Sequence, residues 1–508
     1  MNKGKVWLVG AGPGDPGLLT VKAAEVIRQA DLIVYDALIG DSLFSLFPKE
    51  AEYINVGKRS GNHTMPQDKI DELLLEEALK GKKVVRLKGG DPFLFGRGGE
   101  ELELLAEKGV EYEIVPGITS PIAVPAYNGI PVTHRDYTSS LHIITGHKRK
   151  GSSEDIDFEA LVRTKGTLVF LMGIAALPDL TKGLLDAGMD PDMPTAILER
   201  GTTADQHRIT GTLGTIVDIC SRTTVLTPAI IVVGKVVKLN EDFAWFEKRP
   251  LAGVKVCVTR PKELISTMSS LLRKEGAEVL EMPAIAVKPV EDKAPVEAAI
   301  EDLSAGKYQW IVFTSPSGVR IFMDELFAKA DIRALASVRI ASIGKGSEKA
   351  LNGYGLKSDF IPSVYDGETL GKELAEKLEE GDKVLIPRAA IGNPQLVEEL
   401  KKKETVTVDD IATYDTVYET SHVLDEHAAM ESNPFDFAVF TSASTVKGFT
   451  ESLKGMDFTK VNAVCIGKQT EAAAKGYGMK TWTASKATLK DLVECVKIAA
   501  KELKEERE

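Results

Sequence analysis

The sequence has few cysteines, and their spacing excludes the usual paired metal and redox motifs. Its 508 residues include four cysteines, none in a CxxC arrangement: Cys220, Cys257, Cys465 and Cys495. Each lies among apolar residues, which predicts buried free thiols in a reducing cytoplasm. The seven histidines form no HxxxH or HExxH pair, so we predict no metal site.

Long apolar runs and an excess of basic charge are also missing. No stretch approaches the roughly 18 uncharged apolar residues of a membrane helix, and the initial MNKGKVWLVG enters a strand-like run with no room for a signal peptide. The net charge is 63 − 75 = −12, which argues against nucleic-acid binding; an anionic substrate would need a local basic cluster. We expect a cytoplasmic protein without nucleic-acid or membrane partners.

The composition predicts an ordinary globular chain of two or three domains, with 43% hydrophobic and 27% charged residues. A charged segment at 238–253 follows an apolar strand and precedes a new strand at 254–261. This pattern indicates a domain junction. We predict domains at 1–240 and 253–508, joined by a linker at 241–252.

Both halves alternate short apolar runs with amphipathic stretches, which predicts α/β units with parallel sheets. In the first half this pattern continues beyond residue 138, and a Pro- and Gly-rich break at 116–133 divides two lobes. The second half contains an internal repeat: 311–322 resembles 438–449, and 340–358 resembles 463–481. This repeat predicts two similar lobes with a binding cleft between them.

Glycine-rich loops follow two of the predicted strands of the first half. Gly12, Gly14 and Gly17 formally match the GxGxxG dinucleotide motif, but Pro13 and Pro16 remove the backbone N–H groups that a phosphate needs. The alternative for this run is a tight turn without a ligand. The loop in VVRLKGGDPFLFGRGGEE (84–101) is the more specific signal, because so many glycines allow the main chain to approach a ligand closely.

Six motifs occur together and in order: GAGPGDPGLLT, YDALI, VGKR, RLKGGDPFLFGRGGEE, VPGITS and PAYNGIPVTHR. Over about residues 3–240 the chain thereby resembles the uroporphyrinogen-III C-methyltransferase family. The resemblance implies S-adenosylmethionine as methyl donor, a two-lobed tetrapyrrole-methylase fold with the donor between the lobes, and a homodimer.

Site residues carry over from this resemblance by matching motif. Asp36 resembles the family's proposed proton acceptor and Lys58 its proton donor; the alternatives are a turn or cap acid and a solvated surface cation. Ser120 stands where alanine is common, which should affect packing only. The residues that resemble donor contacts are Pro13, Gly89, Gly90, Asp91, Leu94, Thr119, Ser120, Met172 and Gly201.

Uroporphyrinogen carries eight carboxylates, so its binding requires cations within an otherwise acidic protein. Arg59 and Arg97 are the expected substrate-binding residues of the first half. Lys58, Arg86, Lys88 and Arg135 could add to them.

The second half resembles uroporphyrinogen-III synthase over about residues 251–505. The motifs are VTRP, FTSPSGV, ASIGKGSEKAL, VLIPRA, ATYDTVY, FTSAST and CIGKQTEAA. The resemblance implies two lobes, about 253–286 with 418–508 and 287–417, and a reaction without a cofactor. Tyr414 matches the family's candidate acid, and Ser347 and Thr470 match hydroxyl residues linked to substrate binding.

Arg260 and Arg388 each end a strand beside the expected crevice, and we expect both to bind substrate. Structural alternatives remain for the synthase residues: Ser347 and Thr470 as helix caps, and Tyr414 as a strand residue with a satisfied hydroxyl.

These features together predict a bifunctional enzyme of tetrapyrrole biosynthesis. Its second half cyclises hydroxymethylbilane to uroporphyrinogen III, with loss of water and inversion of ring D. Its first half methylates that product at C2 and C7, giving precorrin-2 for sirohaem or cobalamin. The alternatives are a methyltransferase with a non-catalytic docking module and a nucleotide-dependent oxidoreductase.

Overall fold

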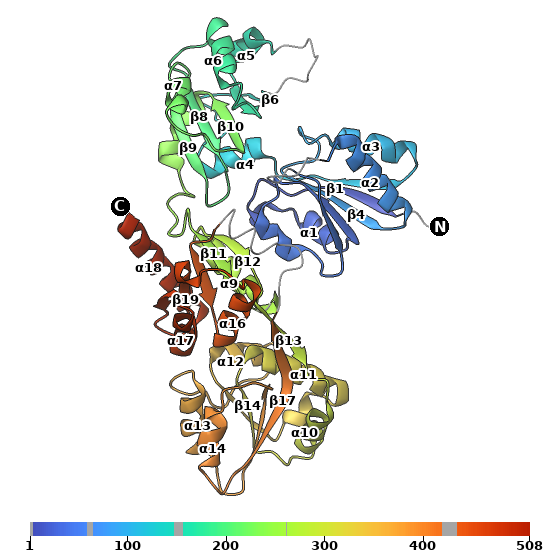
Figure 1. Cartoon of the computed structure of the whole chain (residues 1–508), viewed down its shortest axis with the longest axis vertical. Coiled ribbons are helices and arrows are strands. Elements are labelled where there is room, and N and C mark those ends of the chain that lie inside the picture. Colours follow the sequence, from blue (N-terminus) through green and yellow to red (C-terminus); the bar gives the residue numbers. More distant parts are fainter. Residues whose placement is uncertain (1–3, 58–64, 147–155, 261, 419–433, 508) are drawn as a thin grey trace. The chain divides into compact units, whose positions relative to one another are not determined.

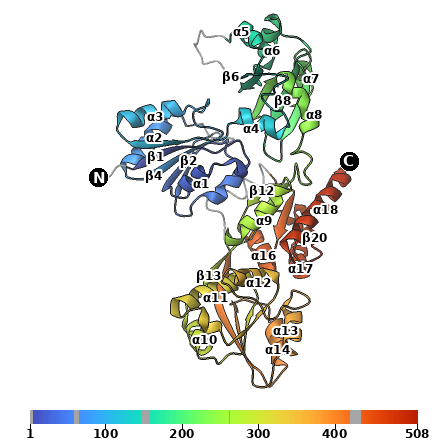
Figure 2. The ribbon, with the colours of Figure 1, turned by 180° about the vertical axis from the view of Figure 1, so that it is seen from behind.

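The computed structural model describes residues 4–57, 65–146, 156–260, 262–418 and 434–507, which form four five-stranded sheets. The first sheet has the order β3-β2-β4-β1-β5 and is entirely parallel. Helix α1 covers one face, and α2 and α3 cover the other (Figure 2). Its strands are β1 (Lys5–Gly10), β2 (Leu32–Tyr35), β3 (Glu52–Asn55), β4 (Lys83–Lys88) and β5 (Glu111–Val115), and its helices are α1 (Val21–Ile27), η2 (Asp41–Leu46), α2 (Gln67–Leu79) and α3 (Gly98–Glu107).

The second sheet, β6-β7-β10-β8-β9, is mixed, which corrects the expectation of continued parallel units beyond residue 138. Only β6 and β7 pair in parallel. The seven residues between β8 and β9 are too few for a parallel crossover, which needs about a dozen. The elements are α4 (Ser120–Tyr127), β6 (Leu141–Thr145), α5 (Phe158–Thr164), β7 (Thr167–Leu171), α6 (Leu177–Asp186), β8 (Pro194–Glu199), β9 (His207–Thr212), α7 (Ile216–Ser221), β10 (Ala229–Val233), η3 (Lys235–Leu239) and α8 (Asn240–Phe243).

The third sheet has the order β12-β11-β18-β19-β20, in which β18, β19 and β20 run parallel. The repeat segment here reads strand, helix, strand, helix, which fits the predicted α/β units. The elements are β11 (Lys255–Val258), α9 (Lys262–Lys274), β12 (Glu278–Glu281), β18 (Phe437–Phe440), α16 (Ala443–Ser452), η5 (Phe458–Lys460), β19 (Asn462–Cys465), α17 (Lys468–Gly476), β20 (Lys480–Thr483) and α18 (Leu489–Arg507).

The fourth sheet, β13-β17-β16-β14-β15, contains the other copy of the repeat. The long strand β17 pairs antiparallel with β13 and parallel with β16. The elements are β13 (Ile285–Pro289), α10 (Ala294–Ser304), β14 (Trp310–Phe313), α11 (Pro316–Lys329), η4 (Ile332–Leu335), β15 (Arg339–Ser342), α12 (Lys345–Asn352), α13 (Gly367–Ala375), β16 (Lys383–Ala389), α14 (Gln395–Lys401) and β17 (Thr407–Tyr418).

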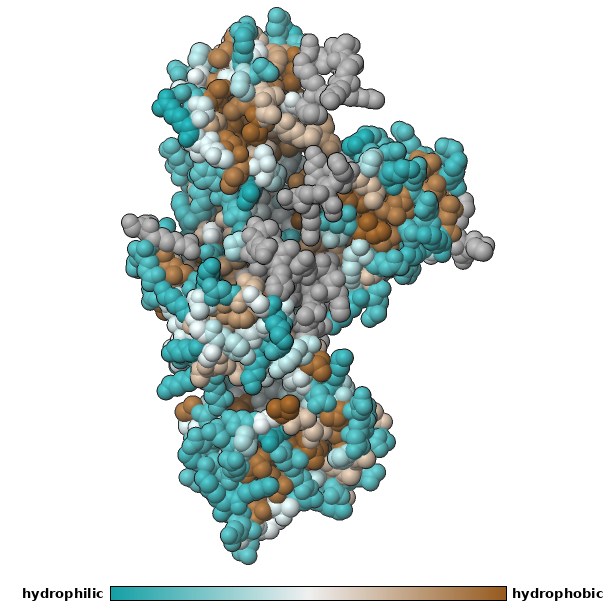
Figure 3. All heavy atoms as spheres, viewed as in Figure 1, coloured by the Kyte–Doolittle hydropathy of each residue, from teal (hydrophilic) through white to brown (hydrophobic). Residues whose placement is uncertain are grey.

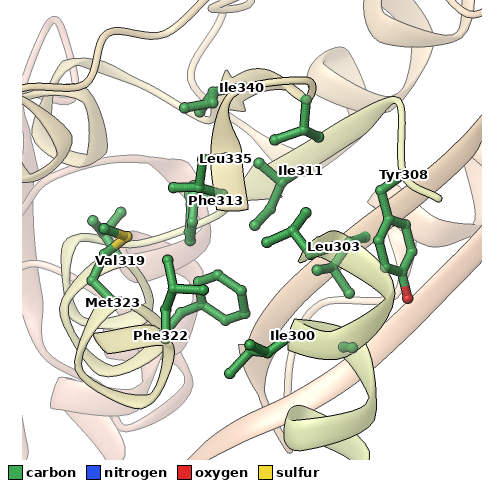
Figure 4. Close-up of a cluster of buried hydrophobic side chains, with 14 of the residues drawn as sticks. Ile300, Leu303, Tyr308, Ile311, Phe313, Val319, Phe322, Met323, Leu335 and Ile340 are labelled. Carbon is green, nitrogen blue, oxygen red and sulfur yellow. The ribbon is translucent and has the colours of Figure 1, made fainter. Parts of the chain in front are cut away.

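Helices cover both faces of this fourth sheet (Figure 1). On one face, Phe313 of β14 packs against Phe322 of α11 and Ile300 of α10 in a cluster of buried apolar side chains (Figure 4). On the other face, Val312 and Ile386 pack against residues of α13 and α14. Side chains of β14 therefore alternate between two cores, as period-two strand geometry requires.

The chain divides into two compact units. The first contains the described residues up to Cys257 together with Ser269–Glu281 and residues 434–436, and the second contains Val258–Met268, Met282 to Tyr418 and the residues from Phe437. The predicted linker lies within the first unit, where Phe246 and Leu251 are buried. This division does not follow the predicted domain limits, which remain a prediction.

Hydrophilic residues occupy most of the face drawn in Figure 3, with smaller apolar patches between them. Among the described helices, none combines the length and the apolar character needed to cross a membrane.

Candidate functional site

The first two glycine-rich loops of the methylase-like half are joined by backbone hydrogen bonds. The N–H of Gly90 donates to the carbonyl of Gly12 over 2.7 Å, and the N–H of Gly12 donates back over 3.2 Å. Because β1 and β4 are adjacent parallel strands, both loops leave the same edge of the sheet. Separate motifs predict that Pro13 and the Gly89–Gly90 pair lie in one site. The structure places them in two loops that these hydrogen bonds join.

Asp91 connects these loops to the VPGI segment after β5. One carboxylate oxygen accepts hydrogen bonds from the N–H groups of Phe93 (2.8 Å) and Leu94 (3.1 Å), and the other accepts from Gly117 N–H (3.0 Å). This carboxylate therefore organises the loop backbone, and its expected contact with the methyl donor stays a prediction.

Gly90 adopts a left-handed conformation with φ of +70°. A Cβ atom at Gly90 would lie 3.9 Å from Ser120 N and from Thr119 Cα. The main chain of the GGD loop thus lies close to the start of α4, where the third set of predicted donor contacts begins.

The second lobe supplies the remaining predicted donor residues. A Cβ at Gly201 would lie only 2.3 Å from Val124 Cγ1, so the turn after β8 packs directly on α4. Met172 follows β7 and is 56% exposed. Met172, Arg200 and Thr202 all have positive φ angles, and such strain in non-glycine residues concentrates at functional sites.

Asp36 follows β2 and lies beside a buried group of charges. Its carboxylate accepts a hydrogen bond from Leu38 N–H (3.0 Å), and its other oxygen lies 3.8 Å from Arg86 Nη2.

Glu101 Oε1 accepts from Arg86 Nε (3.1 Å) and Lys88 Nζ (2.6 Å). Arg86 and Lys88 are therefore not open to substrate carboxylates, which corrects their expected role. Burial lowers the pKa of Lys88, and the neighbouring Arg86 charge lowers it further.

Three other expected cations of this half are Arg97, Lys58 and Arg59. Arg97 has a positive φ of 58° and makes a two-pronged contact with Glu100, with Nε–Oε1 at 3.0 Å and Nη2–Oε2 at 2.5 Å. Its side chain is exposed. Lys58 and Arg59 lie outside the described residues.

In the synthase-like half, Tyr414 of β17 is buried, and its hydroxyl lies 2.8 Å from the hydroxyl of Ser315. Ser315 caps α11 by accepting a hydrogen bond from Gly318 N–H at 2.9 Å. Burial raises the pKa of Tyr414, and the bond from Ser315 opposes that shift. The phenol therefore stays protonated near neutral pH and can donate a hydrogen bond.

Ser347 and Thr470 occupy equivalent positions in the two repeats, each as the third residue of its helix, α12 and α17. Both are buried. Ser347 Oγ has no hydrogen-bond partner within the described parts of the chain. Neither residue is the helix cap, since Gly344 and Gly467 precede these helices, so the capping alternative is wrong.

The two expected arginines differ in availability. Arg388 already forms a fork with Asp410, with Nε–Oδ1 at 2.6 Å and Nη2–Oδ2 at 2.7 Å. Arg260 Nε is buried and has no hydrogen-bond partner among the residues that the structure describes. Burial lowers the pKa of Arg260 to about 10. A guanidinium desolvated in this way favours a carboxylate partner, so Arg260 is the stronger candidate.

The FTSPSGV motif predicts a helix cap that faces the cleft, and Ser315 is the cap of α11. Sequence reasoning did not single out Asp15, Thr202 or Tyr127, which hydrogen bonds join. The structure also contains no group of three metal-ligating side chains within its described ranges.

Two protein families match the chain. The family described as Tetrapyrrole (Corrin/Porphyrin) Methylases matches residues 5–217, and Uroporphyrinogen-III synthase HemD matches residues 266–494.

Curated relatives match either the whole chain or its first half. The Porphyrin biosynthesis protein HemD of Ruminiclostridium josui is 45% identical over 97% of this chain and 98% of its own length. An S-adenosyl-L-methionine-dependent uroporphyrinogen III methyltransferase of Methanosarcina barkeri is 53% identical over 47% of this chain and 94% of its own length. The chain spans 53% of the Siroheme synthase of an Enterobacter species, at 50% identity over 48% of this chain.

Solved structures resemble each half. Uroporphyrin-III C-methyl transferase from Thermus thermophilus, complexed with S-adenyl homocysteine, is 38% identical over 46% of this chain and all of its own, with a TM-score of 0.41. A mutant uroporphyrinogen III synthase from the same organism is 20% identical over 49% of this chain and 99% of its own, with a TM-score of 0.35.

Proposed function

Since this chain belongs to the HemD family of porphyrin biosynthesis proteins and joins a tetrapyrrole methylase to a uroporphyrinogen-III synthase, we propose that its halves act in sequence. The second half closes hydroxymethylbilane to uroporphyrinogen III and releases water. The first half then transfers two methyl groups to C2 and C7, giving precorrin-2. S-adenosylmethionine supplies the methyl groups.

The arrangement around Tyr414 supports the ring-closing step. Loss of the bilane hydroxyl requires a proton or a hydrogen bond at the departing oxygen, and Tyr414 is held protonated in a buried position. The first turns of α12 and α17, with Ser347 and Thr470, offer N–H groups to substrate carboxylates. Arg260 supplies a cation with a buried nitrogen that has no hydrogen-bond partner within the described ranges.

The bridged loops of the first half carry the methylation proposal. Four segments that resemble donor-binding motifs approach one another through the Gly12–Gly90 bridge, the Asp91–Gly117 bond and the Gly201–Val124 contact. Their glycines leave main chain accessible to a ligand of the size of S-adenosylmethionine. Asp36, directly after the neighbouring strand β2, accepts the proton that leaves the methylated pyrrole carbon, and Lys58 completes the pair by family resemblance.

The same resemblance supports a homodimer formed through the methylase half. The four free cysteines favour a cytoplasmic location. No resident metal enters either proposed reaction. Pro13 and Pro16 argue against the dinucleotide alternative, and the family that matches this half is a methylase family.

One experiment tests both activities on the full chain. Hydroxymethylbilane is supplied with and without S-adenosylmethionine, and products are oxidised and identified by mass and isomer. We expect uroporphyrinogen III without the donor and its dimethylated product with it. Formation of only the type I isomer would overturn the synthase proposal. Methylation of supplied uroporphyrinogen III alone would then favour the docking-module alternative.

A further inference from the structure

Asp15, in the first glycine-rich loop, bonds to three different parts of the methylase half. Its Oδ1 accepts a hydrogen bond from Gly17 N–H (2.7 Å) and so caps η1 (Pro16–Leu18). Its Oδ2 accepts from the hydroxyl of Tyr127 (2.7 Å), and its own N–H donates to Thr202 Oγ1 (3.3 Å). Neither Asp15 nor Tyr127 belongs to the expected donor contacts.

The partners of Asp15 are close in sequence to those contacts. Tyr127 ends α4, the helix that begins at Ser120, and Thr202 follows Gly201 directly. The side chain of Gln206 links the two partners: its Oε1 accepts from Thr202 N–H (2.9 Å), and its Nε2 donates to the carbonyl of Tyr127 (3.3 Å). Asp15 therefore closes a small network that joins the first loop to the turn after β8.

The ring of Tyr127 packs against aromatic residues of the segment at 241–252, which was expected to be a linker. Its ring lies 5.2 Å from that of Trp245 and 5.0 Å from that of Phe246. Trp245 Nε1 donates to the carbonyl of Ala126 (2.9 Å), and the Arg249 guanidinium lies over the Trp245 ring at 4.5 Å. Burial and the bond to Asp15 both raise the pKa of Tyr127, so its hydroxyl remains a donor.

We propose that Asp15 and Tyr127 are positioning residues for the methyl donor, which fix the first loop against the Gly201 turn before the donor binds. This proposal rests on the proposed methyltransferase function. The loop contains Gly12 and Gly14, both with positive φ, and without an anchor it would populate other conformations. Ordering such a loop on binding reduces affinity, so the network acts on donor binding rather than on the transfer step.

The test uses the full chain with Tyr127→Phe, which removes one hydroxyl and keeps the ring packing. Titration calorimetry with S-adenosylhomocysteine should show about tenfold weaker binding, the size expected for a lost bond to a charged group. The KM for S-adenosylmethionine should rise similarly, whereas kcat and the KM for uroporphyrinogen III should change less than about twofold. Tyr112→Phe is the matched control, because Tyr112 is an exposed tyrosine of β5.

Unchanged donor affinity in a folded Tyr127→Phe protein would overturn the proposal, as would a fall in kcat without a change in affinity. Asp15→Asn provides a second variant that keeps an oxygen for the Gly17 cap and should also weaken binding. If both variants fail to fold, the network is part of the core and the proposal is wrong. If the wild-type chain neither binds S-adenosylhomocysteine nor methylates, the methyltransferase function itself fails, which is a separate outcome.

Discussion

The hydroxyls of Tyr414 and Ser315 lie 2.8 Å apart, joining the long strand β17 to the first turn of α11. Ser315 uses its oxygen to cap the helix, which fixes its rotamer and therefore the position of the phenol. Gly318 lies beside the ring, since a Cβ there would be in van der Waals contact with Tyr414 Cε1 at 3.5 Å. The candidate acid of the synthase half is thus held in place by a helix cap.

Tyr414→Phe should slow ring closure by about ten- to a thousandfold, because one hydrogen bond to the departing hydroxyl is lost in a water-poor site. The variant should also release more type I isomer, since unassisted closure proceeds without inversion. Isomer separation after oxidation measures both effects. Tyr418→Phe, an exposed tyrosine on the same strand, should behave as wild type. An unchanged rate and isomer ratio in folded Tyr414→Phe would leave Tyr414 a structural residue.

Asp36→Asn should reduce methyl transfer by about a hundredfold or more, the usual contribution of a general base. The amide oxygen can still accept the Leu38 N–H, so the turn after β2 should persist. S-adenosylhomocysteine binding and ring closure should stay close to wild type. Asp186→Asn serves as the control, because Asp186 is an exposed acid of α6 paired with Lys182. Transfer at the parental rate would remove the proton-acceptor role from Asp36.

Glu113 should stabilise the methylase half in a pH-dependent manner. Bonds from Lys22 and Lys5 lower its pKa from 4.5 to about 2. A carboxyl with a depressed pKa stabilises the folded state above its ordinary pKa, and this contribution disappears as the pH falls through about 2. Urea unfolding of wild type and Glu113→Gln should therefore differ near neutral pH and converge on acidification. A difference independent of pH would contradict the assignment.

The buried thiols should react slowly in the native protein. Burial raises the pKa of Cys465 to about 12 and that of Cys495 to about 11, and the thiolate is the reactive form. With a disulfide reagent such as DTNB at about pH 8, we expect the half-buried Cys220 to react first. All four cysteines should react after denaturation. Rapid native reaction of Cys465 would show that its strand opens.

The sequence alone determined the alternating α/β pattern, the repeat of the second half and the two family resemblances, because these depend on local periodicity and on short contiguous motifs. The GGD and VPGI segments, for example, are recognisable one residue after another. Such motifs contain the glycines and prolines that a given loop conformation requires, so they indicate the loop wherever they occur.

Only the tertiary structure decided which side chains are available within those motifs. The sequence suggested Arg86 and Lys88 as cations that could bind substrate carboxylates, yet both are buried with Glu101. Arg388 is paired with Asp410, whereas the equally plausible Arg260 keeps a buried nitrogen without a hydrogen-bond partner in the described ranges. Local sequence patterns also did not indicate the mixed second sheet or the Asp15–Tyr127 hydrogen bond. The Lys88–Glu101 and Asp15–Tyr127 pairs, for example, join residues 13 and 112 positions apart, and the pairing of charges and hydroxyls over such separations is set by packing, which local sequence patterns do not encode.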